Sequence, residues 1–487
     1  MKPSSIVMIL SFALMSPSIP SLSSADENGA QTKKSQEVLP GYWEGTLNAG
    51  VLKLRMGLKF EKTKDGKLGG SMSSIDQGGK RLKIDEITIE AEKVVLRWTL
   101  LKASFVGVIN KEGTKMTGQW KQSGVAFNLT FAKKKEPEAI VRPQEPKRPY
   151  PYVTKKAEFQ NKKANINLVG ELTLPKGDGP HAVAILLSGS GPQNKDGEVL
   201  THKPLLVLSD HLTRKGIATL RWADRGIEGS EGSYFGSTAQ ELASDILAAI
   251  SFLKQQKAID SNNIGIIGHS EGGLLAPLVA SQSKDVTFIV TLAGPALPGE
   301  EVLYLQGAAL VKAMGGDETA LKRQRQTQEM IFRIARNSKK FDEAKKEFEK
   351  EFAKFLEEFS KEEQEAAKKQ EKSVLGQLGR VMTPWFRSFL DYDPRPTLKK
   401  VKCPVLALNG SLDLQVTPKD NLVALRKALG EDRNDVTIKE LPNLNHMFQT
   451  AKTGLVSEYN QIEETMAPVA LNMISDWIRE RVRNRGQ

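Results

Sequence analysis

Ile264-Gly265-Ile266-Ile267-Gly268-His269-Ser270-Glu271-Gly272-Gly273-Leu274 is the stretch that decides the fold of this chain. An apolar segment typical of a strand runs into Gly-x-Ser-x-Gly, and a helical pattern follows, which is the order of a nucleophile elbow. The turn of such an elbow is so sharp that the residues two before and two after the serine must lack side chains. Gly268 and Gly272 stand at those positions, so the pattern predicts that Ser270 projects alone as a nucleophile.

The predicted nucleophile needs a base, because a serine hydroxyl reacts poorly near neutral pH unless a histidine, itself oriented by a carboxylate, takes its proton. In folds with this elbow the partners follow in the order serine, acid, histidine. The chain has five histidines, of which four precede the serine: His181, His202, His211 and His269. His446 is left, in a loop just after the last predicted strand, and we expect it to be the base.

The acid is expected in the turn after the apolar strand at residues 404–408, where Asn409-Gly410-Ser411-Leu412-Asp413 follows. Asp413 agrees with the strand, the turn and the chain order, and is the leading candidate. The alternatives are Asp420, on the following helix, and the pair Asp391 and Asp393, upstream of the strand.

Two backbone N–H groups are expected to stabilise the oxyanion of the tetrahedral intermediate, one from the residue after the nucleophile and one from an earlier loop. Glu271 supplies the first by its position. The second is expected in the small-residue loop at residues 188–192, with Ser190 as our choice and Gly191 as the alternative. The loop does not fit a phosphate cradle, because Asn194 replaces the third glycine of Gly-x-Gly-x-x-Gly and Pro192 removes an N–H.

Strand-like and helix-like segments alternate from residue 153 to the C-terminus, which predicts an α/β-hydrolase domain with a mostly parallel sheet over 153–487. The candidate strands are Ala182–Leu187, Ile217–Arg221, Asn263–Ile267, Val286–Leu292, Val405–Leu408 and Val436–Glu440. About a hundred charged, helix-like residues interrupt the alternation, which predicts an inserted helical cap over about 298–398. One cap helix carries an apolar stripe, for which packing against the cap's own helices is favoured over contact with substrate or membrane: Phe341, Phe348, Phe352, Phe355 and Phe359.

Short alternating strands with turn signals predict a small all-β barrel or sandwich over residues 41–133. Trp43, Trp98 and Trp120 are typical either of core packing or of sugar binding, and core packing is favoured in so small a domain. A run of prolines then indicates an extended, semi-rigid linker over 134–152.

The N-terminus carries signals of export. Lys2, the apolar run at residues 6–15 and the small residues Ser23-Ser24-Ala25 predict a signal peptide over 1–25, followed by a disordered lead over 26–40. No segment is apolar for the roughly 20 residues that a spanning helix needs. We therefore expect an exported protein, periplasmic or secreted, without a stable membrane anchor.

The formal net charge of +12 at pH 7 comes from lysines that are mostly interleaved with glutamates, and no stretch combines clustered basic residues with stacking aromatics. This pattern indicates a solvated basic surface and no nucleic-acid partner. The one cysteine, Cys403, allows neither an intramolecular disulfide nor a cysteine-based metal site, and is expected to be a small buried hydrophobe. The sequence indicates no cofactor and no metal, and it leaves the oligomeric state open.

Several motifs together resemble the bacterial EstD-like esterases, which are grouped with serine aminopeptidase-like α/β hydrolases. The motifs are Leu187–Asp196, Asp224–Gly226, Gly268–Gly273, Leu292–Pro295, Thr383–Phe386, Leu408–Gly410, Asp413–Val416 and Leu444–Phe448. The resemblance runs from about Asn161 to the C-terminus, and the front β domain is similar to one that precedes some members. It implies ester hydrolysis through Ser270, Asp413 and His446.

The chain departs from this family at two points. Ala223-Asp224 stands where relatives often have two acidic residues, and Glu228 stands where they often have glycine. Asp224 and Arg225 are expected to tie down a loop beside the site. The sequence thus favours an exported hydrolase of small-molecule carboxylic esters; the alternatives are a serine (amino)peptidase of the same fold and a non-catalytic envelope binding protein whose β domain does the work.

Overall fold

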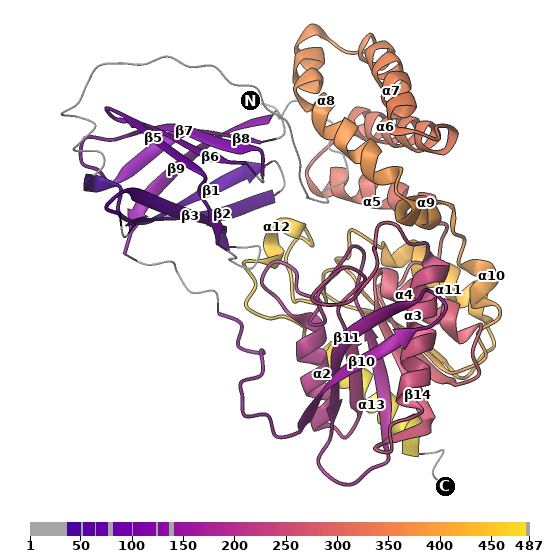
Figure 1. Cartoon of the computed structure of the whole chain (residues 1–487). Helices are drawn as coiled ribbons and strands as arrows, with labels where there is room; N and C mark the ends of the chain where they lie inside the picture. Colours follow the sequence, from indigo (N-terminus) through magenta and orange to yellow (C-terminus); the bar gives the residue numbers. More distant parts are fainter. Residues whose placement is uncertain are drawn as a thin grey trace.

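The computed structural model of the chain describes residues 37–49, 52–63, 65–75, 81–99, 101–122, 125–135 and 141–483. The predicted signal peptide, and residues 26–36 of the predicted lead, lie outside the described residues. The described part comprises an N-terminal all-β domain, a linker, and an α/β domain that carries a helical insertion (Figure 1).

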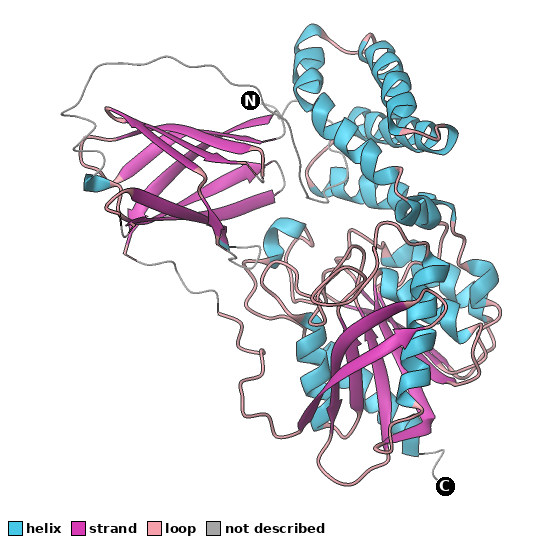
Figure 2. Cartoon of the chain, in the orientation of Figure 1, coloured by secondary structure: helices cyan, strands magenta, loops and turns pink. Residues whose placement is uncertain are grey.

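The all-β domain is one curled antiparallel sheet with the strand order β4-β3-β2-β1-β9-β8-β7-β6-β5 (Figure 2). Its strands are β1 (Gly41–Ala49), β2 (Leu52–Lys62), β3 (Leu68–Ser74), β4 (Leu82–Lys83), β5 (Glu86–Glu90), β6 (Lys93–Trp98), β7 (Ala103–Ile109), β8 (Lys115–Gln122) and β9 (Val125–Lys134). Alternation along β2 buries Met56, Leu58 and Phe60 on the concave core side, as a strand with a period of two requires.

The three tryptophans of this domain belong to its core. Trp43, Trp98 and Trp120 are 0%, 2% and 1% exposed, and the rings of Trp98 and Trp120 lie 5.0 Å apart. Buried indoles of this kind stabilise a small sheet through the large apolar area they remove from water. The structure therefore agrees with core packing, not with sugar binding, at these positions.

The described part of the linker, residues 141–152, is attached to the α/β domain by specific hydrogen bonds. The Arg142 guanidinium donates to Thr201 Oγ1 at 2.8 Å, and the Thr465 N–H donates to Gln144 Oε1 at 2.6 Å. Side chains thus fasten the proline-rich segment, which makes a turn at Arg142–Glu145, to the α/β domain.

The α/β domain is built on a second sheet with the strand order β10-β11-β13-β12-β14-β15-β16-β17. Its strands are β10 (Val153–Asn161), β11 (Ile166–Leu174), β12 (His181–Leu187), β13 (Ala218–Trp222), β14 (Ile259–His269), β15 (Val286–Leu292), β16 (Val405–Gly410) and β17 (Val436–Leu441). β10 and β11 form an antiparallel hairpin, and the strands from β13 to β17 in this order are parallel. This order is that of the α/β-hydrolase fold.

Helices cover both faces of this sheet because its central strands are apolar on both faces. In β12, Val183 and Ile185 belong to the core beneath α3 and α4, whereas Ala184 and Leu186 belong to the core beneath α2 and α13. The helices of this domain are α2 (Pro204–Arg214), α3 (Ala239–Leu253), α4 (Glu271–Ala280), α10 (Arg395–Leu398), α11 (Pro418–Leu429), α12 (Val456–Tyr459) and α13 (Pro468–Arg483). Such two-sided burial is what a parallel sheet requires.

Six helices lie between β15 and β16, and the first five form an insertion that we call the helical insertion (Figure 1). These five are α5 (Gly299–Ala313), α6 (Glu318–Asn337), α7 (Phe341–Leu356), α8 (Lys361–Val381) and α9 (Pro384–Asp391). Phe348 and Phe352 of α7 are buried in one cluster with Phe332 of α6 and Leu378 of α8, while Phe341 is 42% exposed. The phenylalanine stripe therefore packs mainly against the insertion's own helices. Among the described residues, no helix is both long and apolar enough to span a bilayer.

Candidate active site

Ser270 occupies a sharp turn between β14 and α4. Its backbone has φ 53° and ψ −116°, a conformation that side chains rarely adopt, and its N–H donates to the Leu292 carbonyl at 2.8 Å. A Cβ atom added to Gly268 would lie 1.9 Å from the Gly272 carbonyl oxygen, and one added to Gly272 would lie 2.6 Å from the Ser188 carbonyl oxygen. Both positions therefore require glycine, as the elbow pattern predicts.

His446 and Asp413 form a buried pair at the carboxyl ends of two neighbouring strands. Asp413 lies in the turn after β16 and His446 in the loop after β17, and these strands pair in parallel. His446 Nδ1 lies 2.8 Å from Asp413 Oδ2, and the two side chains are 4% and 0% exposed. The other carboxylate oxygen, Oδ1, accepts the N–H groups of Gln415 and Val416 at 2.8 and 2.9 Å. This arrangement leaves a proton on Nδ1 and a lone pair on Nε2.

His269 links this pair to the elbow. Its Nε2 donates to the His446 carbonyl oxygen at 2.8 Å, and the two imidazole rings lie 4.8 Å apart. Burial, together with the neighbouring His446, lowers the pKa of His269 to about 3, so its ring is neutral. The residue just before Ser270 thus holds the backbone of the histidine loop against the elbow.

The other aspartates considered from the sequence lie elsewhere. Asp420 accepts from the Thr417 hydroxyl at the start of α11, Asp391 pairs with Arg336, and Asp393 pairs with Arg395. Within the described residues, none of the three contacts His446. Asp413 is therefore the carboxylate that meets the predicted base.

Two backbone N–H groups near Ser270 are available to a ligand. No described residue accepts a hydrogen bond from the N–H of Ser190 or from that of Glu271. The Gly191 N–H, our alternative donor, is engaged, since it donates to the Tyr234 hydroxyl oxygen at 3.2 Å. The Gly272 N–H donates to the Ser188 carbonyl at 3.1 Å and ties the loop to the elbow. This pattern favours Ser190 over Gly191 as the second oxyanion donor.

Asp224 and Arg225 brace the segments beside this loop. Asp224 accepts the Gln193 N–H at 2.8 Å and the Ser188 hydroxyl at 3.3 Å, and burial raises its pKa to about 7. Arg225 forms a bidentate pair with Asp245 at 2.7 and 2.9 Å. Both residues thus tie down loops, as we expected from the sequence.

Glu228, which stands where relatives often have glycine, has a backbone conformation that favours glycine. Glu228 has φ 45°, in the left-handed region that favours glycine. A glycine at this position in relatives therefore suits the backbone, and the glutamate adopts the same conformation at some cost in strain.

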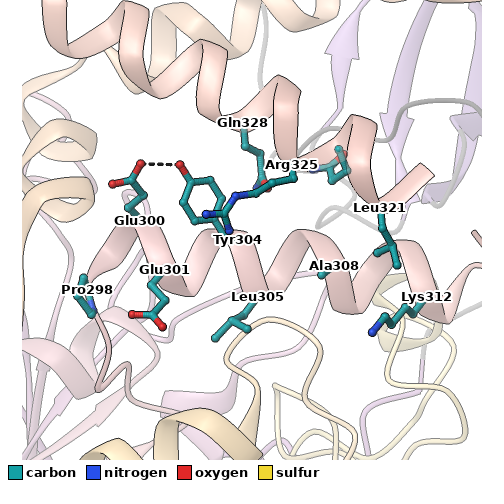
Figure 3. Close-up of a pocket in the computed structure, with 11 residues that line it drawn as sticks. Pro298, Glu300, Glu301, Tyr304, Leu305, Ala308, Lys312, Leu321, Arg325 and Gln328 are labelled. Atoms are coloured by element: carbon teal, nitrogen blue, oxygen red, sulfur yellow. Dashed lines mark hydrogen bonds between the residues drawn. The ribbon is translucent and has the colours of Figure 1, made fainter. Parts of the chain in front are cut away.

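A cavity of about 620 Å³ lies between α5 and α6 of the helical insertion (Figure 3). Its lining residues are Pro298, Glu300, Glu301, Tyr304, Leu305, Ala308, Lys312, Leu321, Gln324, Arg325 and Gln328. Ser270, Asp413 and His446 are not among them. One turn of α5 nonetheless reaches the acid loop, because Val302 packs against Val416.

Three side chains near the elbow were not predicted from the sequence. The Glu271 carboxylate, considered there only for its backbone N–H, is buried against Tyr234 and Trp385. Trp385 lies in the Thr383–Phe386 motif of the resemblance, which was the one signal for it; Tyr234 lies in a loop without a recognisable motif.

The sheet order, the serine elbow and the Asp–His pair define the chain as an α/β hydrolase. Residues 138–438 match the family described as X-Pro dipeptidyl-peptidase (S15 family). The match covers more than half of the chain, and the chain belongs to this family.

The individual proteins to which this chain is similar include named esterases and an α/β hydrolase. The chain is 28% identical over 296 residues to Esterase EstD of Thermotoga maritima, and the alignment spans 60% of each protein. Among solved structures, an esterase of Pyrococcus furiosus, Pf2001, has a TM-score of 0.40 at 15% identity, with coverage of 68% of this chain and 91% of that one. The α/β hydrolase GrgF from Penicillium sp. sh18 has a TM-score of 0.42 at 16% identity, with coverage of 68% and 99%. The sheet order and the family match together define the fold.

Proposed function

We propose that the chain is an exported serine hydrolase that cleaves carboxylic esters through an acyl-enzyme. The observation that carries this proposal is the buried Asp413–His446 pair, with a 2.8 Å contact, held by His269 beside the strained Ser270. Backbone strain at such an elbow costs stability and serves to expose the serine hydroxyl.

In this mechanism Ser270 Oγ attacks the ester carbonyl carbon while His446 Nε2 takes the hydroxyl proton. The N–H groups of Ser190 and Glu271 donate to the oxyanion, and Asp413 stabilises the imidazolium that forms. The proton then passes from Nε2 to the leaving alkoxide, which departs as an alcohol. Water, activated by the same histidine, hydrolyses the acyl-enzyme and releases the carboxylic acid.

We further propose that the helical insertion is a cap that shapes the substrate site. Two contacts support this: Trp385 of α9 hydrogen-bonds to the side chain of Glu271, and Val302 of α5 packs against Val416 beside the acid. Figure 1 also draws the insertion on the side of the sheet where the loops after the parallel strands lie. An acyl or alcohol group bound at Ser270 would then meet residues of α5 and α9.

The family description supports a second candidate, a peptidase that removes dipeptides ending in proline, because the same triad chemistry cleaves amides. A panel of p-nitrophenyl acyl esters and X-Pro p-nitroanilides separates the two. We expect ester hydrolysis by the wild type, its loss in Ser270→Ala, and its retention in Ser281→Ala, at the far end of α4. Preferential anilide cleavage would favour the peptidase; a folded protein that turns over neither class would favour the non-catalytic binding protein.

Export is also a proposal, supported by Lys2, the apolar run at residues 6–15 and the small residues at 23–25. Expression of the full chain in a bacterium, followed by fractionation and N-terminal sequencing, tests it. We expect a mature protein that begins at about Asp26 in the exported fraction; an intact Met1 in the cytosol would contradict this.

A further inference from the structure

A buried carboxylate stands next to the proposed nucleophile. Glu271 is the first residue of α4 and is 3% exposed. A carboxylate in such a place is costly unless hydrogen bonds replace its lost hydration. The reaction described above uses only the backbone of Glu271, so its side chain has a purpose that the mechanism leaves unassigned.

Two side-chain donors hold this carboxylate. Trp385 Nε1–H, which can only donate, contacts Oε1 at 2.8 Å, and the Tyr234 hydroxyl contacts Oε2 at 2.9 Å. Because the Tyr234 oxygen already accepts the Gly191 N–H at 3.2 Å, its own proton is directed to Glu271. The Tyr234 hydroxyl therefore joins the Glu271 carboxylate to the backbone of the loop after β12.

This hydrogen-bond network connects Glu271 to three separate segments of the chain. Gly191 belongs to the loop after β12, Tyr234 to the loop between β13 and α3, and Trp385 to α9 of the helical insertion. The last two segments are themselves joined. The backbone N–H of Trp385 donates to the Phe235 carbonyl at 3.2 Å, and the rings of Tyr234 and Trp385 lie 5.7 Å apart. Glu271 is the point at which all three segments meet.

We propose that Glu271 is a positioning residue whose carboxylate holds the oxyanion hole in place, and that Trp385 couples the helical insertion to this carboxylate. This inference rests on the proposed function. The N–H of Glu271 and the N–H of Ser190 are the two proposed donors. Tyr234 joins their two segments, because its hydroxyl contacts both the Glu271 carboxylate and the N–H of Gly191, the residue after Ser190. A donor pair must be held within about 0.5 Å of its productive geometry to stabilise an oxyanion. The carboxylate provides this restraint, and α9 completes it.

The test compares Glu271→Gln and Trp385→Phe with the wild-type full chain. Glu271→Gln keeps the size of the side chain but directs an amide N–H₂ at a hydroxyl donor, and Trp385→Phe removes the one indole N–H. We measure kcat and KM on a p-nitrophenyl ester per fluorophosphonate-titrated site, the inhibition constant of a trifluoromethyl ketone, and the Tm. The ketone forms a tetrahedral adduct whose oxyanion reports directly on the donors.

We expect Glu271→Gln to lower kcat by roughly 10- to 100-fold with KM within threefold, and to weaken the ketone by the same factor. Trp385→Phe should shift both quantities in the same direction, by roughly 3- to 10-fold, and the double variant should lose less than the product of the two. Two controls should leave both quantities unchanged. Trp477→Phe, on α13, removes an indole N–H that donates to Thr437 of β17, and Glu44→Gln changes a buried glutamate of the β domain.

A lowered Tm with unchanged kcat per titrated site and unchanged ketone affinity would overturn the proposal, because it would reduce Glu271 to a purely structural residue. If Glu271→Gln does not fold, Trp385→Phe and Tyr234→Phe carry the same test. A wild type that neither labels nor hydrolyses esters would instead contradict the proposed function, so the two failures are distinguishable.

Discussion

Replacing Asp413 by Asn should disable the proposed base without disturbing the fold. Oδ1 of Asp413 accepts two backbone N–H groups, from Gln415 and Val416, so the carbonyl oxygen of an asparagine will take that position. Its NH₂ group then occupies the Oδ2 position, 2.8 Å from His446 Nδ1. A donor facing Nδ1 forces the proton onto Nε2, and His446 can no longer accept the proton of Ser270.

We expect kcat/KM for a p-nitrophenyl ester at pH 8 to fall about 10⁴-fold in Asp413→Asn, which corresponds to about 5.5 kcal/mol of transition-state stabilisation. The Tm should stay within a few degrees of the wild-type value because the two backbone hydrogen bonds are kept. Asp420→Asn is the matched control and should change kcat/KM less than twofold. A loss below tenfold in Asp413→Asn, or an equal loss in the control, would refute the assignment of the acid.

Three further predictions concern stability. Burial raises the pKa of Asp224 to about 7, so the contribution of Asp224 to the free energy of unfolding should fall as the pH rises from about 4 to 7, and the wild type should lose stability relative to Asp224→Asn. Denaturant titrations at pH 4.5 and 8 that give equal wild-type-to-variant differences would contradict this. Gly268→Ala should abolish soluble folded protein because its Cβ would lie 1.9 Å from a carbonyl oxygen, whereas Gly376→Ala, in open space on α8, should raise the free energy of unfolding by about 0.5–1 kcal/mol. Circular dichroism melts check both variants, and a well-folded Gly268→Ala would be inconsistent with the elbow geometry. Gln324→Met should raise the free energy of unfolding by about 1 kcal/mol because the buried Gln324 Oε1 has no described hydrogen-bond partner, and a lower value would show that the amide is satisfied in solution.

The parts of the site that were predictable from the sequence are those with local rules. The demand for glycine at Gly268 is local, because a Cβ there would meet the Gly272 carbonyl within the same five-residue turn. The demand at Gly272 also involves Ser188 of a neighbouring loop, but the motif already indicates both glycines. Asp413 and His446 are distant in sequence from Ser270, but strand order brings the carboxyl ends of β14, β16 and β17 to one edge of the sheet. Chain order and the small number of histidines were therefore enough to select them.

Other features depend on tertiary packing and leave little trace in the sequence. Strand β10 was not among the candidate strands because it lies at the sheet edge, where Lys155, Lys156 and Glu158 are tolerated in contact with water. Tyr234 and Trp385 both contact Glu271 because the loop after β13 and helix α9 fold over the elbow. No rule of sequence spacing connects these three residues, since Trp385 follows Glu271 by more than a hundred positions.

The central claim, that Ser270 is the nucleophile, is tested most directly by mapping a covalent adduct. The folded protein is treated with diisopropyl fluorophosphate, and its peptides are sequenced by mass spectrometry alongside those of Ser270→Ala. We predict one adduct per chain, on Ser270, with loss of ester hydrolysis in proportion to labelling, and no adduct in a folded Ser270→Ala. An adduct on another serine, or ester hydrolysis that persists after Ser270 is fully modified, would contradict the account.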